Sequence, residues 1–198
     1  MNTAWIIILL PAITGICSLF IDSEKLRKNI LLVVAFVHLA LVMRLCSGEA
    51  GELNGIWLGL DNLTKIFLTL TSLLFTGSAV YAMIYIDKHP QVEKADLAGW
   101  QFLSNRNAVF TACMQLFLAA MSLAILSMHF GLQWIGIEAT TLASTPLIYY
   151  HRNRRSLEAA WKYLIICSVG IALALMGVFF LAMTTTSHVQ TFTPAGLI

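Results

Sequence analysis

The sequence predicts an all-α protein, a polytopic membrane helix bundle of six transmembrane helices that forms a single domain over residues 1–198. Three observations support this. First, 59% of the residues are hydrophobic and 11% are charged, and the mean hydropathy is +0.80, which is outside the usual range of soluble domains. Second, six apolar stretches have the length of about 17 to 25 residues that a helix needs to cross a bilayer. Third, the basic residues gather in alternate connections.

The predicted spans are Thr3 to Ile21, Asn29 to Cys46, Asn62 to Ile86, Asn107 to Ser127, Phe130 to Tyr150 and Leu157 to Met183. Each must be a helix, because an open strand in lipid would leave its backbone amides unpaired. Met128 and His129 alone separate the fourth span from the fifth, which predicts a tight antiparallel hairpin. The first span lacks a basic n-region and a clear cleavage pattern, so it is interpreted as a retained span rather than a signal peptide.

The basic residues predict the orientation of the bundle. Nine lie in the first, third and fifth connections: Lys25, Arg27, Lys28, Lys88, Lys94, Arg106, Arg152, Arg154 and Arg155. The second connection holds only Arg44, with Glu49, Glu52 and Asp61, and the fourth holds none. By the positive-inside rule the odd connections face the cytoplasm, and both termini face the outer, periplasmic side.

Several classes of function have no support in the sequence. A net charge of +2, with basic residues dispersed over short connections, does not predict nucleic-acid binding. Four cysteines, Cys17, Cys46, Cys113 and Cys167, form no CxxC or Cys/His cluster and are interpreted as buried thiols. The five histidines are scattered as well, so the sequence predicts no metal site and no cofactor.

Glu138 is the one acid in the fifth span, and an ionised acid near the middle of a bilayer costs roughly 2.5 kcal/mol or more. It lies eight residues, or about 12 Å, into that span. Thr141 and Thr145 follow at i+3 and i+7, on the same helix face. Pro146 has no amide hydrogen and leaves one carbonyl without its usual partner. These residues fit either a protonatable site in a hydrated path or a structural acid that is hydrogen-bonded to a neighbouring helix.

Lys162 is the second candidate, about five residues into the sixth span. Glu158 precedes it by four residues, the favourable order for an ion pair on a helix. On position alone, Lys162 fits a side chain that reaches back to the interface beside Glu158. The depths of Glu138 and Lys162 differ by about 10 Å along straight helices, so no direct salt bridge is expected, whereas a relay through water or a threonine hydroxyl fits.

Three further features are weaker candidates. His38, in the middle of the second span, is expected to make a helix-to-helix hydrogen bond rather than a relay step. His129 lies in the tight turn. Gly170, Ala174 and Gly177 form a small-residue face on the sixth span, interpreted as a site of close helix packing.

The segments around both candidates resemble a known family. Three runs carry the likeness: Glu138 to Leu142, Glu158 to Tyr163 (Glu-Ala-Ala-Trp-Lys-Tyr) and Ser168 to Leu175 (Ser-Val-Gly-Ile-Ala-Leu-Ala-Leu). They are similar to the antiporter-like membrane subunits of complex I and related membrane-bound hydrogenases, and most similar to component F of hydrogenase-4 and formate hydrogenlyase complexes. Upstream, Leu60 to Tyr81 resembles the third helix of the same subunits.

The resemblance implies translocation of protons, or of sodium ions, driven by electron transfer in partner subunits. Glu138 matches the buried glutamate of the family's fifth helix and Lys162 the lysine of its sixth, both proposed members of the ion path. Glu158 matches too, as a supporting residue, with Thr141 and Thr145. Family members carry no redox cofactor. The implied location is the inner membrane of a prokaryote, and the implied partners are further membrane subunits and a peripheral redox arm.

The sequence departs from the family in length. The family's subunits have about fourteen helices, including a lysine on the seventh helix that partners the glutamate, whereas this sequence ends at Ile198. A second chain would supply helices seven onward, or the sequence is a reduced relative or a fragment. The alternative to ion translocation is a structural or assembly subunit without its own ion path. A small autonomous antiporter is the third hypothesis.

Overall fold

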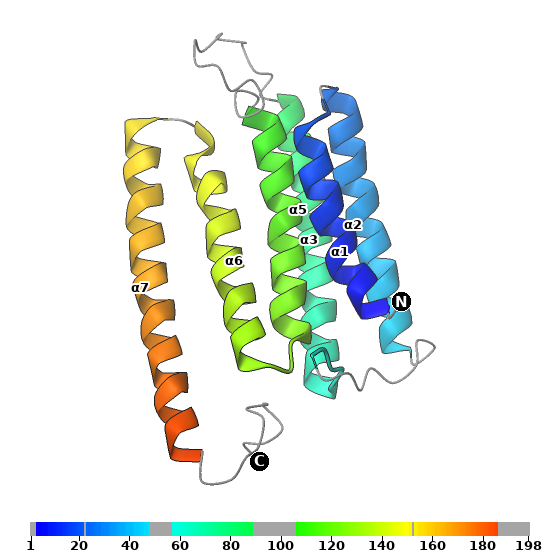
Figure 1. Cartoon of the computed structure of the whole chain (residues 1–198). Helices are drawn as coiled ribbons and strands as arrows, with labels where there is room; N and C mark the ends of the chain where they lie inside the picture. The colour runs from blue at the N-terminus through cyan, green and yellow to red at the C-terminus, as the bar shows by residue number, and fades with distance from the viewer. Residues whose placement is uncertain (1–2, 22, 48–56, 89–105, 152, 186–198) are drawn as a thin grey trace.

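The computed structural model describes residues 3–21, 23–47, 57–88, 106–151 and 153–185. These residues form six α-helices and one short 3-10 helix: α1 (Thr3–Leu19), α2 (Glu24–Cys46), α3 (Asn62–Lys88), α5 (Arg106–Leu126), α6 (Phe130–Ile148), η1 (Tyr149–His151) and α7 (Arg154–Thr185). Consecutive helices run in opposite directions along one bundle (Figure 1). The predicted all-helical class is confirmed for the described residues.

Most predicted boundaries lie within three residues of the observed ones. The largest difference is at α2, which begins at Glu24 rather than Asn29, so Lys25, Arg27 and Lys28 belong to its first turns. Four of the described helices are long and apolar enough to cross a membrane: α2, α3, α5 and α7. The shorter α1 is apolar, and α6 carries Gln133 and Glu138 within its 19 residues.

The helix α5 occupies the centre, in contact with α1, α2, α3 and α6 (Figure 1). Two apolar clusters fill the space between α5 and its neighbours. One, at the end where α5 finishes, contains Ile7, Val42, Leu45, Leu68 and Leu126. The other, nearer the start of α5, contains Leu31, Ala35, Phe75, Ala79 and Leu118.

The polypeptide turns tightly between α5 and α6, as predicted. The Ser127 hydroxyl donates to the His129 carbonyl at 2.9 Å. The imidazole Nδ1 of His129 accepts the Gly131 amide at 3.2 Å, so His129 caps the N-terminus of α6. The strand-like residues before α3 pair with this turn, because the Met128 amide donates to the Trp57 carbonyl. His129 therefore has a structural role here.

The helix α7 lies at the edge of the bundle and packs mainly on α6 (Figure 1). None of its most apolar window is buried within the described structure. Gly170 and Gly177 have no atom within 4 Å of where a side chain would begin. Close packing at this small-residue face is therefore not observed against any described part of the chain.

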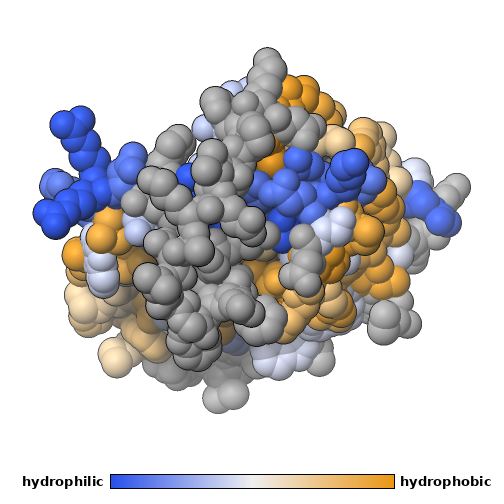
Figure 2. Space-filling view, turned by 90° about the horizontal axis from the view of Figure 1, so that it is seen from above, coloured by the Kyte–Doolittle hydropathy of each residue, from blue (hydrophilic) through white to orange (hydrophobic). Residues whose placement is uncertain are grey.

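One end of the bundle carries the start of α2, α5 and α7. Lys25, Arg154 and Arg155 are exposed there. Figure 2 shows this end, with hydrophilic residues in separate groups between apolar flanks. Arg27 differs from the other basic residues because it is only 2% exposed, and it donates to the Ile21 carbonyl at 3.0 Å. Lys94, Arg152, Glu49 and Glu52 lie outside the described residues.

Gly136 fixes the distance between α5 and α6. A Cβ atom at this position would lie 2.8 Å from the Ala124 amide nitrogen, a backbone atom that cannot rotate away. We expect Gly136→Ala to lower the free energy of unfolding by about 1–3 kcal/mol, because overpacking forces the backbones apart. Gly177→Ala, where space is open, is the matched control and should be neutral or stabilising. Thermal unfolding in detergent or nanodiscs measures both, and equal Tm values for the two variants would contradict the contact.

Candidate functional site

Glu138 lies near the middle of α6 and faces α7. Its Oε1 accepts a hydrogen bond of 3.1 Å from the Ser168 hydroxyl. Its Oε2 is buried and has no hydrogen-bond partner among the described residues. A carboxylate can accept about four hydrogen bonds, so most of this group's capacity is unused by the described residues. An unpaired carboxylate oxygen in an apolar environment is costly, and such groups in native proteins usually have water, a proton or another partner.

The interface between α6 and α7 is polar at three levels. The indole of Trp134 donates to the Ile171 carbonyl at 3.3 Å. One turn further along α6 comes the contact of Glu138 with Ser168, and the Ser144 hydroxyl then lies 2.9 Å from the Tyr163 hydroxyl. Polar contacts between membrane helices usually contribute about 0.6–2 kcal/mol each. Together they hold the carboxylate against the central part of α7.

Thr141 and Thr145 lie near Glu138 on α6, as the spacing predicts. Their hydroxyls donate to carbonyls of their own helix, Thr141 to Glu138 and Thr145 to Thr141, each at 2.8 Å. In these positions the hydroxyl oxygens retain the capacity to accept a further hydrogen bond. A relay through either threonine would require the hydroxyl to rotate away from the carbonyl.

The structure does not place the Lys162 ammonium in contact with the Glu138 carboxylate. Its ammonium contacts Glu158 Oε1 at 2.5 Å, and the two side chains are 69% and 65% exposed. Ser168, which is level with Glu138, lies six residues further along α7, or about 9 Å along the axis and about 120° around it. The axial offset agrees with the 10 Å expected from sequence. The angular difference places Lys162 on a side of α7 that no described helix covers.

A second polar site, formed by α2, α3 and α5, joins residues that lie far apart in the sequence. Both imidazole nitrogens of His38 are hydrogen-bonded, Nδ1 to the Ser72 hydroxyl and Nε2 to the Ser122 hydroxyl, each at 3.0 Å. All three side chains are 1% exposed or less. The expected helix-to-helix hydrogen bond of His38 is confirmed, and the two serines were missed.

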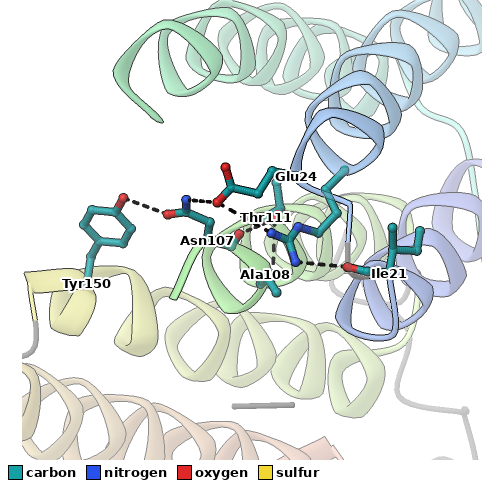
Figure 3. Close-up of polar contacts among 7 residues, drawn as sticks. Ile21, Glu24, Asn107, Ala108, Thr111 and Tyr150 are labelled. Carbon is teal, nitrogen blue, oxygen red and sulfur yellow. Dashed lines mark hydrogen bonds and ion pairs between the residues drawn. The ribbon is translucent and has the colours of Figure 1, made fainter. Parts of the chain in front are cut away.

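A third polar site, at the end where α2 and α5 begin, was missed entirely. The Tyr150 hydroxyl donates to Asn107 Oδ1 at 3.1 Å, and Asn107 Nδ2 donates to Glu24 Oε1 at 2.8 Å (Figure 3). The Arg106 guanidinium lies 4.6 Å from the centre of the Tyr150 ring, a cation–π distance. The end of α6, through Tyr150 in η1, is thus linked to α2 by way of α5.

A signal for these sites is present in the sequence. The fourth predicted span contains Asn107, Thr111, Gln115 and Ser122, and their spacing of 4, 4 and 7 residues puts them on one face of a helix. Polar residues on one face of an apolar helix predict a partner within the bundle. Among the described residues, no group of three His, Cys, Asp or Glu side chains could hold a metal ion.

Comparisons with known proteins relate this chain to a family of membrane proteins. Residues 127–194 match the family described as NADH:quinone oxidoreductase/Mrp antiporter, TM. The hydrogenase-4 component F homolog of Methylacidiphilum infernorum is 34% identical over 119 residues, which is 60% of this chain and 24% of that protein. NADH-quinone oxidoreductase subunit N of Bacillus anthracis is 32% identical over 180 residues, covering 87% of this chain and 32% of that protein.

A third relative, NADH-quinone oxidoreductase subunit N 2 of Rhizobium meliloti, is 28% identical over 171 residues, covering 84% of this chain and 33% of that protein. The chain therefore spans about a quarter to a third of the length of these relatives. The resemblance to antiporter-like subunits, inferred from the runs around Glu138 and Lys162, is confirmed.

The link between Tyr150 and Asn107 can be tested directly. Tyr150→Phe removes one hydroxyl from a buried ring and leaves Asn107 Oδ1 without this donor. We expect a loss of about 1–3 kcal/mol in the free energy of unfolding, because a buried acceptor is left unsatisfied. Tyr149→Phe removes a hydroxyl from the neighbouring residue and is the matched control. If thermal unfolding shows the same Tm for both variants, the hydrogen bond does not stabilise the bundle.

Proposed function

Because this chain is an antiporter-like, complex I-related membrane sequence, we propose that it is the proton-translocating, or sodium-translocating, part of a membrane-bound hydrogenase or complex I-like oxidoreductase. In this proposal Glu138 is the acid that gains and loses the proton. Electron transfer takes place in partner subunits, and the chain itself contributes no redox centre. The family match covers the segment with Glu138 and Lys162, and this supports the assignment to an ion path.

The single observation that carries the proposal is the second oxygen of Glu138. Oε2 is buried and has no hydrogen-bond partner in the described part of the chain, while Oε1 accepts from Ser168. A purely structural acid would be expected to use both oxygens, because an unpaired buried carboxylate oxygen costs free energy. An oxygen that is fixed in place but unpaired is suited to accept a proton from water or from a neighbouring polar group.

Lys162 and Glu158 form the supporting part of the site. Because the pair is exposed on a side of α7 that no described helix covers, we place it where α7 meets lipid headgroups, water or another subunit. Thr141 and Thr145 supply hydroxyls along α6 between Glu138 and the end of the helix. A further helix against α7, from a second chain or a longer polypeptide, would bring a cation toward Oε2.

The six helices would all cross the bilayer, with the starts of α2, α5 and α7 on the cytoplasmic side. The exposed basic residues at this end support that orientation. The membrane would be the inner membrane of a prokaryote, and the partners would be other membrane subunits and a peripheral hydrogenase or complex I-like arm. The names of the two relatives quoted first, a hydrogenase-4 component and a quinone oxidoreductase subunit, support this setting.

A structural subunit without its own ion path is the second candidate function. The hydrogen bond from Ser168 to Glu138 favours it, because that contact alone is enough to hold α6 and α7 together. The two functions predict different effects of the same substitutions.

The test substitutes Glu138 by Gln in the complete complex, reconstituted into liposomes. Glutamine keeps the shape of the glutamate side chain and can accept the Ser168 hydrogen bond. Its amide does not gain and lose a proton as a carboxylate does. We expect the number of protons pumped per electron to fall to the background leak while the amount of complex is unchanged. Ser168→Ala is the control that disturbs the contact without removing the acid, and pumping should persist in it. Unchanged pumping in Glu138→Gln, or loss of assembled complex in both variants, would favour the structural function.

The role of Lys162 is tested by comparing Lys162→Gln with Glu158→Gln. Exposed ion pairs contribute little to stability, so both variants should unfold at the Tm of the wild type. If Lys162 belongs to the ion path, Lys162→Gln lowers proton pumping much more than Glu158→Gln does. Equal and small effects in the liposome assay would mean that Lys162 serves only as the partner of Glu158.

A further inference from the structure

A second line of buried polar groups runs along α5, away from Glu138. Asn107, Thr111, Gln115 and Ser122 are each 3% exposed or less. At about 100° per residue, Thr111, Gln115 and Ser122 fall within roughly 40° of one another on the helix surface. The line extends over 15 residues, or about 22 Å, which is most of the hydrocarbon thickness of a bilayer. It faces the interior of the bundle, where apolar side chains would pack at lower cost.

Gln115 is the unusual member of this line. The side chain is 0% exposed, and neither its Oε1 nor its Nε2 has a hydrogen-bond partner among the described residues. An amide that is buried without partners costs several kcal/mol in an apolar environment. In native proteins, buried water satisfies such groups when it finds two to four polar partners. Gln115 can both donate to and accept from water, so it can bind one molecule on each side.

The backbone of α1 comes close to α5 at the level of Gln115. A Cβ at Gly15 would lie 3.2 Å from both the Ala112 carbonyl oxygen and the Gln115 Cβ. Ser18, one turn further along α1, is also 0% exposed and donates to the Gly15 carbonyl. The surface of α1 that packs on this part of α5 therefore carries a buried hydroxyl one turn from the level of Gln115.

The two ends of the line differ. At the start of α5, Asn107 bonds to Glu24, whose side chain is 45% exposed, so this end reaches the surface. Beyond Ser122, the apolar cluster of Ile7, Val42, Leu45, Leu68 and Leu126 closes the other end. The line of polar residues therefore reaches the surface only at the Glu24 end. At its other end, it stops at His38.

The hydrogen bonds of His38 are compatible with proton exchange. The Ser122 hydroxyl donates to the Leu118 carbonyl at 2.8 Å, so it accepts from His38 Nε2, and Ser72 donates to Nδ1. If His38 gains a proton at Nδ1, that nitrogen becomes a donor, and the Ser72 hydroxyl can turn and accept. Both protonation states leave the ring nitrogens paired.

The charged groups on the surrounding helices lie at a distance. The described part of α1 has no charged residue, and those of the other three helices are Glu24, Lys25, Arg27, Lys28, Arg44, Lys65, Asp87, Lys88 and Arg106. The nearest to the His38 layer along their own helices are Arg44, six residues from His38, and Lys65, seven residues from Ser72, about 9–10 Å each. Tyr81, Tyr85, Cys17, Cys46 and Cys113 are the other titratable groups there. No carboxylate on these helices contacts the imidazole in the described structure, so proton exchange at the ring would require water.

We propose that the buried face of α5 is a water-binding path, with Gln115 as its central water ligand, through which the ring proton of His38 exchanges with the side of the membrane near Glu24. The path is separate from Glu138 and from the α6–α7 interface. It goes beyond the proposed function, and it holds whether or not Glu138 translocates an ion.

The experiment is solid-state NMR on the full chain in lipid bilayers, with ¹⁵N-labelled histidine and glutamine. In the wild type we expect magnetisation transfer from water to the Gln115 side-chain amide and to a His38 ring nitrogen. Gln115→Met keeps the volume but cannot bind water, so the signal at His38 and its exchange with D2O should be lost or strongly slowed. Gln133→Met, which removes a glutamine from α6, is the matched control and should leave His38 exchange unchanged.

Two results would overturn the path. One is unchanged His38 exchange in Gln115→Met, which would show that protons reach the ring by another route. The other concerns stability, which can be read even if the NMR spectra of the variant are poor. If Gln115 has no water, replacing its unpaired amide by an apolar chain relieves a penalty, and Tm rises. If water is bound, Gln115→Met loses those hydrogen bonds, and Tm falls.

Discussion

The central position of α5 is the constraint on which the rest of the structure depends. This helix contacts α1, α2, α3 and α6, so each of its faces must suit a different neighbour. Close backbone approach is achieved with small residues, Gly15 opposite Ala112 on one side and Gly136 opposite Ala124 on the other. Close approach lets dispersion forces act between helices where no water is available to drive association. Buried polar side chains share the rest of the α5 surface with residues of the two apolar clusters.

Several polar side chains of the bundle are paired across helices, in addition to the hydroxyls that bond to carbonyls of their own helix. His38 joins α2 to α3 and α5, Asn107 joins α5 to α2 and to Tyr150, and Ser168 joins α7 to Glu138. In a low-dielectric interior these contacts set the helix register, because sliding by one turn would leave buried donors and acceptors unpaired. Among the described side chains, Glu138 Oε2, the Gln115 amide and Arg106 Nε are buried without a hydrogen-bond partner.

The position of α7 explains why the two candidate residues behave differently. Glu138 is on α6, between α5 and α7, and its carboxylate has a fixed contact. Lys162 is on the outer part of α7, where its contact is with Glu158 on its own helix. A membrane helix with one uncovered apolar face is stable in lipid, so nothing in the described structure constrains Lys162 further.

The sequence by itself determined the helical class, six apolar segments close to the observed ones, the tight turn at His129 and the special position of Glu138. These follow from the cost of exposing backbone amides or a carboxylate to lipid, which depends on local composition and spacing. The tertiary structure alone decided that Arg27 is buried, that Glu24, Asn107 and Tyr150 form one chain of hydrogen bonds, and that Lys162 points away from Glu138. Gly170 and Gly177, expected at a packed interface, face open space. These outcomes depend on the rotation of each helix about its axis and on its neighbours, which the period of a uniformly apolar segment does not encode.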